Sequence, residues 1–242
     1  MAEKKFILFI VEGLNDKKEI ESILHTPFFS ECMQKYKPYV KPVNGDITAD
    51  KNSSENNIKD KVGQIVRDFR KRGVPYSNIK VSDIYKLVHI VDTDGVFISR
   101  TDIVKTDDVS FVYEDECIKS SNPDVVFGRN RKKANILRVL KDVNQIDNIP
   151  YELYFVSCNM DHMLFGRINI QSQMKKALAD AYVIECKNNP DCIFNSVFNE
   201  GISYKCTYEE SWREIQIGTN SLKRHTNINL FFSSVINEGV LQ

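Results

Sequence analysis

The chain has no feature that would assign it to a membrane-bound, secreted or strongly charged class. Its longest apolar run, Phe6 to Val11, is far shorter than the roughly 20 residues of a membrane-spanning helix, and no signal-peptide cleavage region accompanies it. Lysine plus arginine equals aspartate plus glutamate, at 33 residues each, so the net charge gives no indication of a nucleic-acid partner. We therefore expect a cytoplasmic protein that makes no contact with membranes.

Cysteine pairs, nucleotide-binding loops and repeats are also missing. The six cysteines are dispersed with no Cys-x-x-Cys pair, which argues against a zinc site or a disulfide framework and favours reduced thiols. The chain contains no Gly-x-x-x-x-Gly-Lys-Ser/Thr loop, no internal repeat and no low-complexity linker. We expect one α/β domain over residues 1–166 and a helical C-terminal extension over residues 167–242 that packs on it.

Strands and helices are predicted to alternate along the first two thirds of the chain. The apolar pattern predicts four main strands, at residues 5–11, 39–43, 85–91 and 151–156. A short additional strand is expected at 109–113. Helices are predicted at residues 16–24, 57–72, 130–143, 159–166, 170–187, 208–215 and 227–237. This order favours parallel pairing, so the predicted fold is a mainly parallel four-stranded α/β sheet flanked by helices.

Two acidic motifs stand at the ends of two of these strands. The first predicted strand leads into Glu12-Gly13-Leu14-Asn15-Asp16, and the third leads into Asp92-Thr93-Asp94-Gly95. Because open α/β sheets place their sites at the carboxyl ends of their strands, we expect Glu12, Asp92 and Asp94 to lie together. Clustered carboxylates repel one another unless they are protonated or bridged by a cation, and an all-oxygen set suits Mg²⁺ or Mn²⁺.

Each of these acids also has an ordinary structural explanation. Glu12 fits the start of a helix, where the dipole favours a negative charge, and Asp16 suits the cap of that helix as well as it suits a metal. Asp92 and Asp94 would face the same side of a continuing strand, which suits joint ligation, whereas Asp94-Gly95 is also a turn-forming pair. The presence of both motifs favours the metal site.

Together the two motifs resemble those of the Toprim domain, which occurs in topoisomerases, bacterial primases, small ribosomal-RNA maturases and the overcoming-lysogenization-defect nucleases. In that family a first strand ends in Glu, often as Glu-Gly-x-x-Asp, and a later strand ends in Asp-x-Asp. The resemblance covers roughly residues 5–165. It implies that Glu12 is a general acid/base or a metal ligand, and that Asp92 and Asp94 hold the metal.

A third segment, residues 155–164, resembles the Cys-Phe-Glu-x-Trp-Leu-Leu segment of RloB-like proteins, which are standalone Toprim-related proteins of phage-defence and restriction loci. Asp161 stands where that segment has Glu, and the Trp is missing. The resemblance implies that Asp161 is an additional metal or water ligand. Because this chain carries no ATPase motif, a separately encoded ATPase is a candidate partner.

The basic run Arg129-Asn130-Arg131-Lys132-Lys133 is predicted to begin a helix. Positive side chains at the start of a helix oppose its dipole, so a nearby anion would explain their presence. Arg129, Arg131 and Lys133 are therefore predicted to contact phosphate.

Three functions from different classes follow from these patterns. The leading hypothesis is a Mg²⁺- or Mn²⁺-dependent nuclease that cleaves phosphodiester bonds in DNA or RNA, with phage defence or RNA processing as its setting. The first alternative is a phosphatase of the haloacid dehalogenase type with Asp92 as nucleophile, although no downstream Gly-Asp-x-x-x-Asp motif is found. The second is a non-catalytic Toprim-like module that binds nucleic acid or a partner. The sequence leaves open whether the chain forms a homo-oligomer.

Overall fold

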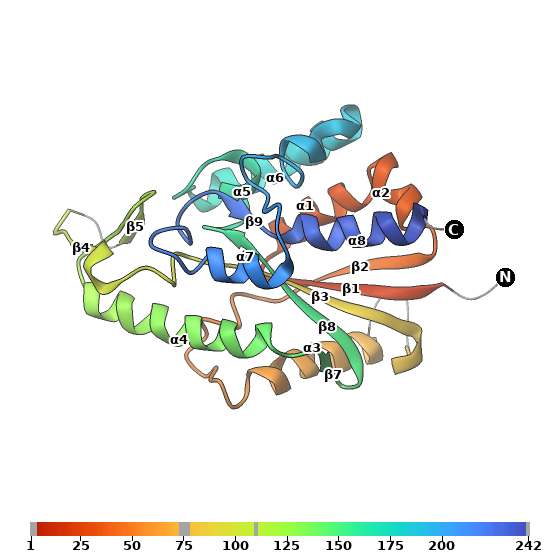
Figure 1. The fold of residues 1–242 in the computed structure, drawn as a ribbon, viewed down its shortest axis with the longest axis horizontal. Helices are drawn as coiled ribbons and strands as arrows, with labels where there is room; N and C mark the ends of the chain where they lie inside the picture. Colours follow the sequence, from red (N-terminus) through yellow and green to blue (C-terminus); the bar gives the residue numbers. More distant parts are fainter. Residues whose placement is uncertain (1–3, 73–77, 109–110, 241–242) are drawn as a thin grey trace.

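The fold is built on a mainly parallel sheet. This computed structural model describes residues 4–72, 78–108 and 111–240, and its main strands lie in the order β2-β1-β3-β8-β7 (Figure 1). The parallel strands are β1 (Lys5–Val11), β2 (Tyr36–Pro42), β3 (Ile84–Asp92) and β8 (Ile149–Ser157). The short strands that pair antiparallel with β8 are β7 (Gln145–Ile146) and β9 (His225–Thr226). The predicted mainly parallel α/β sheet is confirmed, with two short antiparallel strands added.

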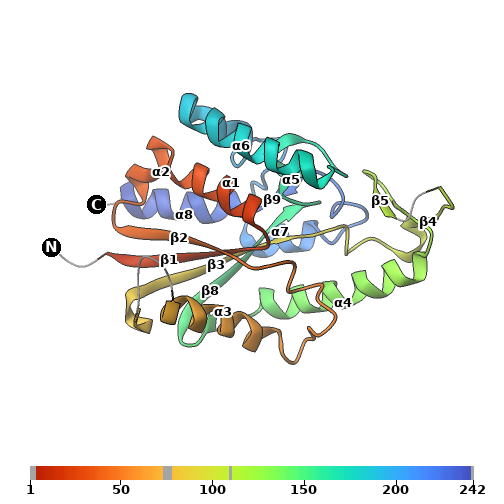
Figure 2. The same cartoon turned by 180° about the vertical axis from the view of Figure 1, so that it is seen from behind.

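Helices cover both faces of this sheet, as Figures 1 and 2 show from opposite sides. The first face carries α1 (Leu14–Leu24), α2 (Pro27–Cys32), α5 (Met160–Phe165), α6 (Ser172–Asn188) and α8 (Ile228–Val240). The second face carries α3 (Ile58–Arg72), α4 (Pro123–Lys141) and α7 (Tyr208–Glu214). In β1, Ile7 and Phe9 pack into the first layer, while Leu8 and Ile10 pack into the second. Because both faces are covered, this strand is apolar throughout.

A second, three-stranded sheet lies beside the beginning of α4 (Figure 1). Its strands, in spatial order, are β4 (Ile103–Lys105), β6 (Ile118–Ser120) and β5 (Phe111–Tyr113). Ile103 and Ile118 of these strands belong to a small apolar cluster that also contains Val126 of α4 and Leu222. The strand predicted at 109–113 is found at 111–113, and residues 109–110 lie outside the described residues. Strands of three residues are too short to show a clear alternation in the sequence.

Helix α4 begins earlier than predicted. It starts at Pro123 rather than at Asn130, because the Asn122 side chain accepts a hydrogen bond from the Val125 N–H and proline suits the first turn. The basic run at residues 129–133 therefore lies in the interior of α4. The prediction that this run begins a helix is wrong, and its cations do not face the dipole of a helix start.

The C-terminal segment is not helical throughout. Besides α6, α7 and α8 it contains the strand β9, which pairs with β8 of the main sheet, and the 3₁₀ turn η3 (Pro190–Asn195) after α6. Two other 3₁₀ turns, η1 (Val81–Asp83) and η2 (Arg100–Asp102), lie earlier in the chain. Trp212 of α7 packs into the second layer, whereas Phe231 of α8 packs into the first. Residues 167–240 thus contact both faces of the sheet rather than adding a layer to one of them.

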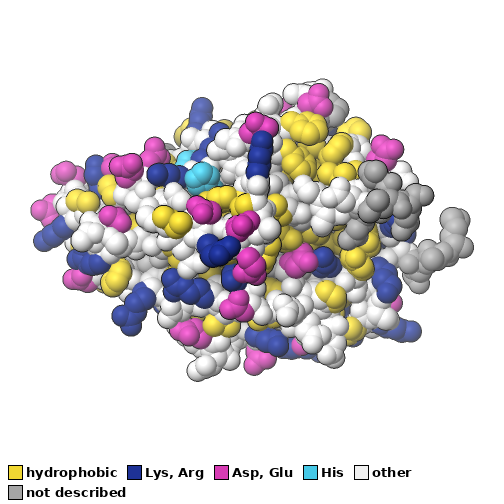
Figure 3. Space-filling view, viewed as in Figure 1, with side chains coloured by type: hydrophobic (Ala, Val, Ile, Leu, Met, Phe, Trp, Pro, Cys, Tyr) yellow, Lys and Arg dark blue, Asp and Glu magenta, His cyan; other side chains and the backbone are white. Residues whose placement is uncertain are grey.

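Charge is evenly spread over the molecular face shown in Figure 3, where basic and acidic side chains are interspersed. This matches the balanced composition of the chain. Within the described residues, no helix is both long and apolar enough to cross a lipid bilayer. The six cysteines are free thiols, as the sequence predicts.

Candidate active site

Acidic residues gather where the carboxyl ends of the four parallel strands meet. An open cleft of about 540 Å³ lies at this edge of the sheet. The charged side chains that line it are Glu12, Asp16, Asp46, Asp92, Asp161 and Lys175. Of the acids that the strand-end rule was expected to bring together, Glu12 and Asp92 line the cleft and Asp94 does not. The other candidate ligands, Asp16 and Asp161, also line it, while Asp46 and Lys175 were not foreseen.

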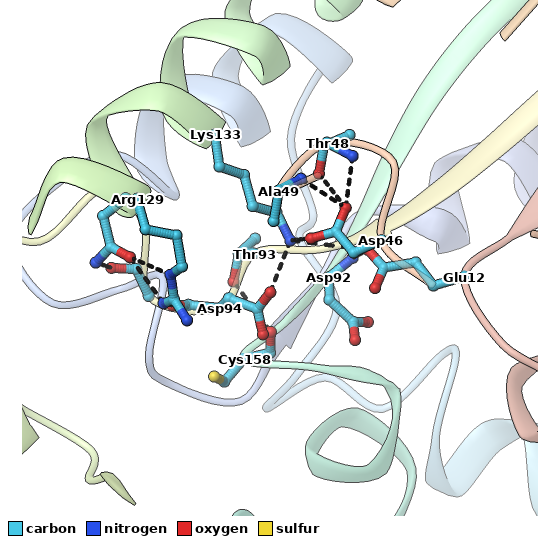
Figure 4. Close-up of polar contacts among 12 residues, drawn as sticks. Glu12, Asp46, Thr48, Ala49, Asp92, Thr93, Asp94, Arg129, Lys133 and Cys158 are labelled. Atoms are coloured by element: carbon cyan, nitrogen blue, oxygen red, sulfur yellow. Dashed lines mark hydrogen bonds and ion pairs between the residues drawn. The ribbon is translucent and has the colours of Figure 1, made fainter. Parts of the chain in front are cut away.

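A buried lysine joins one side of this acidic group. Lys133 projects from α4, has no exposed side-chain surface, and places its Nζ 2.6 Å from Asp46 Oδ2 and 2.7 Å from Asp94 Oδ2 (Figure 4). Glu12 Oε1 lies 3.7 Å from the same Nζ. Burial opposes the charged ammonium, but the carboxylates of Asp94, Glu12 and Asp46 outweigh it and hold the pKa of Lys133 well above its usual value.

Asp94 points toward α4 and the small sheet instead of the cleft. Strand β3 ends at Asp92, and Asp94 adopts a left-handed backbone conformation with φ of 51°. Its Oδ1 accepts a hydrogen bond from the Tyr113 hydroxyl at 2.9 Å, and its Oδ2 contacts Lys133. The expectation that Asp92 and Asp94 face the same side of one strand is therefore wrong, because the Asp94-Gly95 turn intervenes.

Glu12 and Asp92 form the part of the site whose charge is least compensated. The Asp92 backbone N–H donates to Glu12 Oε1 at 3.1 Å, and Asp92 Oδ1 accepts from the Met160 N–H at 3.1 Å. Burial raises the pKa of both carboxyls well above the ordinary value, and the neighbouring carboxylates raise it further. For Glu12, Lys133 opposes this rise without cancelling it. The pair therefore favours a proton or a cation at the cleft.

Asp16 and Asp161 lie on the opposite side of the cleft, on α1 and α5. Asp16 Oδ2 accepts the Gly13 backbone N–H at 2.7 Å, so it caps α1, and burial raises its pKa despite that bond. Asp161 Oδ2 lies 2.6 Å from the Lys175 ammonium, whose side chain is 38% exposed. Lys175 is therefore a cation of the cleft that a ligand could reach.

The carboxylates do not form a ready-made metal cage. In the part of the chain that the structure describes, no three Asp, Glu, His or Cys side chains are arranged to hold one ion. Glu12, Asp92 and Asp94 therefore do not form such a group, and the ion that they were expected to share stays a prediction. Mg²⁺, however, usually binds through one or two carboxylates and completes its shell with water and substrate phosphate. Glu12 and Asp92, both facing the cleft, fit that smaller donor set.

The predicted phosphate contacts have three different environments. Lys133 is buried among carboxylates, so the prediction that it contacts phosphate is wrong. Arg129 donates to Asn130 Oδ1 at 3.1 and 2.7 Å, and its guanidinium lies 4.9 Å from the centre of the Phe111 ring. Arg131 is exposed on α4, so its phosphate contact stays a prediction.

Sequence reasoning missed Asp46 although a signal for it was present. The residues Asn44-Gly45-Asp46 directly follow the predicted second strand and also have the composition of a turn. The same strand-end rule that selected Glu12 would also have selected Asp46. Lys133 and Lys175 carry no comparable signal, because only the packing of α4 and α6 brings them to the acids.

Fold and site together define an α/β protein with a carboxylate-rich cleft at the carboxyl ends of its parallel strands. Comparisons with protein-family models, curated proteins and solved structures found no match to the chain. The likeness to Toprim domains therefore stays an interpretation of the two acidic motifs.

Proposed function

We propose that the protein is a Mg²⁺- or Mn²⁺-dependent phosphodiesterase that cleaves nucleic acid at this cleft. The observation that carries the proposal is the pair Glu12 and Asp92, two partly buried residues at the carboxyl ends of the central strands, joined by the bond from the Asp92 N–H to Glu12 Oε1, whose carboxyls have too little positive charge beside them. Such a pair accepts a divalent cation readily, since the cation relieves both burial and mutual repulsion. The resemblance to Toprim motifs supports nucleic acid as the substrate.

The residues of the cleft have separate roles in this proposal. Glu12 and Asp92 would hold the ion, which when bound activates water and neutralises charge on the scissile phosphate. Lys175 faces the same cleft and offers a hydrogen-bonding cation to a phosphate oxygen. Asp16 fixes the turn after Glu12 by capping α1. Arg131 extends the phosphate contacts outward along α4.

The proposal is tested by incubating the purified protein with end-labelled single- and double-stranded DNA and with tRNA, in Mg²⁺, Mn²⁺ or EDTA. We expect cleavage that requires the metal. Asp92→Asn should lower it by more than about 100-fold, because losing even an outer partner of a ligand costs about 10–100-fold. Asp68→Asn, which changes an exposed carboxylate on α3, is the matched control and should cleave normally.

Other outcomes would favour the other functions. Hydrolysis of small phosphomonoesters, with a phosphoaspartate at Asp92 trapped by beryllofluoride, would replace the nuclease by a phosphatase of the haloacid dehalogenase type. Metal-independent binding of nucleic acid without cleavage of any substrate would support the non-catalytic module instead.

A further inference from the structure

The two sides of the acidic group differ in how their oxygens are used. Asp46 Oδ1 accepts hydrogen bonds from the Thr48 N–H, the Thr48 hydroxyl and the Ala49 N–H, at 2.7, 2.5 and 3.1 Å. Asp46 Oδ2 contacts Lys133, and both oxygens of Asp94 are taken by Tyr113 and Lys133. Every oxygen on this side therefore already has a partner.

On the side that faces the cleft, some carboxylate oxygens have no hydrogen-bond partner among the described residues. Glu12 Oε1 and Asp92 Oδ1 each accept one backbone N–H, and among the described residues no hydrogen-bond donor reaches Glu12 Oε2 or Asp92 Oδ2. The pKa values follow the same division. Although burial opposes it, the Lys133 ammonium and the hydrogen bonds hold the pKa of Asp46 below its usual value, whereas those of Glu12 and Asp92 are raised.

Lys133 is a built-in component of the site. Its side chain is completely buried, and the neighbouring Asn130 donates to the Gly95 carbonyl at 3.2 Å, which fixes α4 to the turn after β3. A metal ion placed between Asp46 and Asp94 would have to displace this ammonium, whose side chain has no exposed surface.

We propose that the Lys133 ammonium takes the place of a second metal ion, so that the site binds one divalent cation, on the Glu12 and Asp92 side. The inference rests on the proposed function, because it concerns the same carboxylates. Sites that use two ions for phosphoryl transfer set them about 3.5–4 Å apart and share carboxylates between them. Here Glu12 is the shared carboxylate, since it lies beside both Asp92 and Lys133.

The number of bound ions is the direct test. Mn²⁺ is titrated into the full chain, with free Mn²⁺ measured by electron paramagnetic resonance and heat by calorimetry, neither of which depends on activity. We expect one ion per chain. Asp92→Asn should weaken binding at least tenfold, whereas Asp94→Asn should leave the affinity within about threefold, because Asp94 holds Lys133 rather than the ion.

Lys133→Met tests the replacement itself, because the unbranched methionine side chain is one atom shorter than that of lysine and carries no charge. With the fold retained by circular dichroism, this variant should bind two ions. A folded Lys133→Met that still binds one ion would overturn the inference. If it does not fold, Asp94→Asn decides, and a loss of affinity equal to that of Asp92→Asn would overturn it.

The wild-type titration separates this inference from the proposed function. Two ions per wild-type chain would contradict the role of Lys133 and leave metal-dependent cleavage standing. No bound ion, at Mn²⁺ concentrations up to those used for cleavage, would remove the proposed function and this inference together.

Discussion

Asp46 and Asp92 carry the same side chain at the same edge of the sheet, yet their pKa values shift in opposite directions. Both are partly buried, and this burial raises the pKa in each case. Asp46 has an ammonium at 2.6 Å, which outweighs burial, while Asp92 has mainly other carboxylates beside it. The direction of each pKa shift depends on charged side chains that are distant in the sequence. It therefore could not be inferred from the motif that contains each aspartate.

Glu19 extends this contrast to a carboxyl outside the cleft. It lies on α1, is 1% exposed, and neither of its oxygens has a hydrogen-bond partner among the described residues. Burial, followed by the charges of Asp16 and Asp161, raises the pKa of Glu19 from about 4.5 to about 8, against the opposing effect of Lys175 and Lys18. The folded protein therefore holds a proton at Glu19 that the unfolded chain releases near pH 4.5.

This proton makes the free energy of unfolding depend on pH. Because the folded state binds more protons than the unfolded state, stability falls as the pH rises from about 4.5 to about 8, by roughly 3–5 kcal/mol. Glu19→Gln should remove this part of the slope and be more stable than wild type at pH 8. Urea denaturation in EDTA, between pH 5 and pH 9, measures the difference.

The matched control is Glu21→Gln, on the same helix but with a side chain that is 38% exposed and paired with Lys17. It should keep the wild-type slope. If the curves of Glu19→Gln and wild type run parallel across this range, Glu19 is not protonated in the folded protein at neutral pH.

At the scale of elements, the turn after β3 and the helix α4 determine the geometry of the site. The Asp94-Gly95 turn directs Asp94 toward Lys133, and Asn130 of α4 donates to the Gly95 carbonyl. Gly95 has φ of +65°, and a Cβ added there would come within 2.3 Å of the buried Leu222 side chain. The turn thus needs glycine both for its backbone and for its close packing.

Two glycine substitutions should therefore have opposite effects. Gly95→Ala should destabilise the protein by about 1–3 kcal/mol, through the left-handed backbone and the contact with Leu222. Gly128→Ala should stabilise it by about 0.5–1 kcal/mol, because Gly128 lies inside α4 with open space where the Cβ would be. Thermal melting measures both, at about 2–4 °C per kcal/mol for a chain of this size. An equal melting temperature for Gly95→Ala and wild type would show that the turn tolerates a side chain.

Most of the helices and strands were predictable from the sequence, and each element that was misplaced or missed has a physical cause. β1 is a nearly continuous apolar run, which the sheet requires because helices cover both its faces, and its predicted position matches the observed one. The edge strand β2 buries only Val40, and it begins at Tyr36, before the predicted start at residue 39. The start of α4 was missed because Asn122-Pro123 also fits a turn. The pair indicates a helix start only if the residues that follow it are recognised as helical. The small sheet was mostly missed, since three-residue strands are stabilised by contacts with α4 rather than by their own pattern.

For the site, the sequence predicted the right edge of the sheet and four of the acids that line the cleft, Glu12, Asp16, Asp92 and Asp161. It assigned Asp94 to the metal, and the left-handed turn at that residue could not be foreseen from Asp-x-Asp spacing alone. It assigned Lys133 to phosphate, because a run of basic residues does not show which of them points inward. On α4, Arg131 is exposed while Lys133, two residues on, is buried.

At the scale of the whole molecule, neutral net charge conceals a strong local imbalance. Basic and acidic residues are equal in number, yet the cleft gathers five carboxylates with Lys175, and Lys133 lies behind them. Bringing these charges together costs stability, and binding a cation would recover part of that cost. Metal should therefore stabilise the entire fold, since an ion that binds only the native state shifts the unfolding equilibrium.

This effect is measurable as a change in melting temperature. At a Mn²⁺ concentration about 100 times its dissociation constant, stabilisation should be about 2.7 kcal/mol, or roughly 5–10 °C for a chain of this size. Asp92→Asn removes one of the repelling charges, so without metal it should melt at the same temperature as wild type or higher, and with Mn²⁺ it should gain much less.

The raised pKa values of Glu12 and Asp92 mean that protons compete with the metal, so the gain for wild type should grow as the pH rises. Melting wild type, Asp92→Asn and the surface control Asp68→Asn with Mn²⁺ or EDTA, at pH 5.5 and pH 8, tests each part. A Mn²⁺ gain that is equal in wild type and Asp92→Asn would show that the ion binds elsewhere, and a gain that does not change with pH would show that these carboxyls do not bind it.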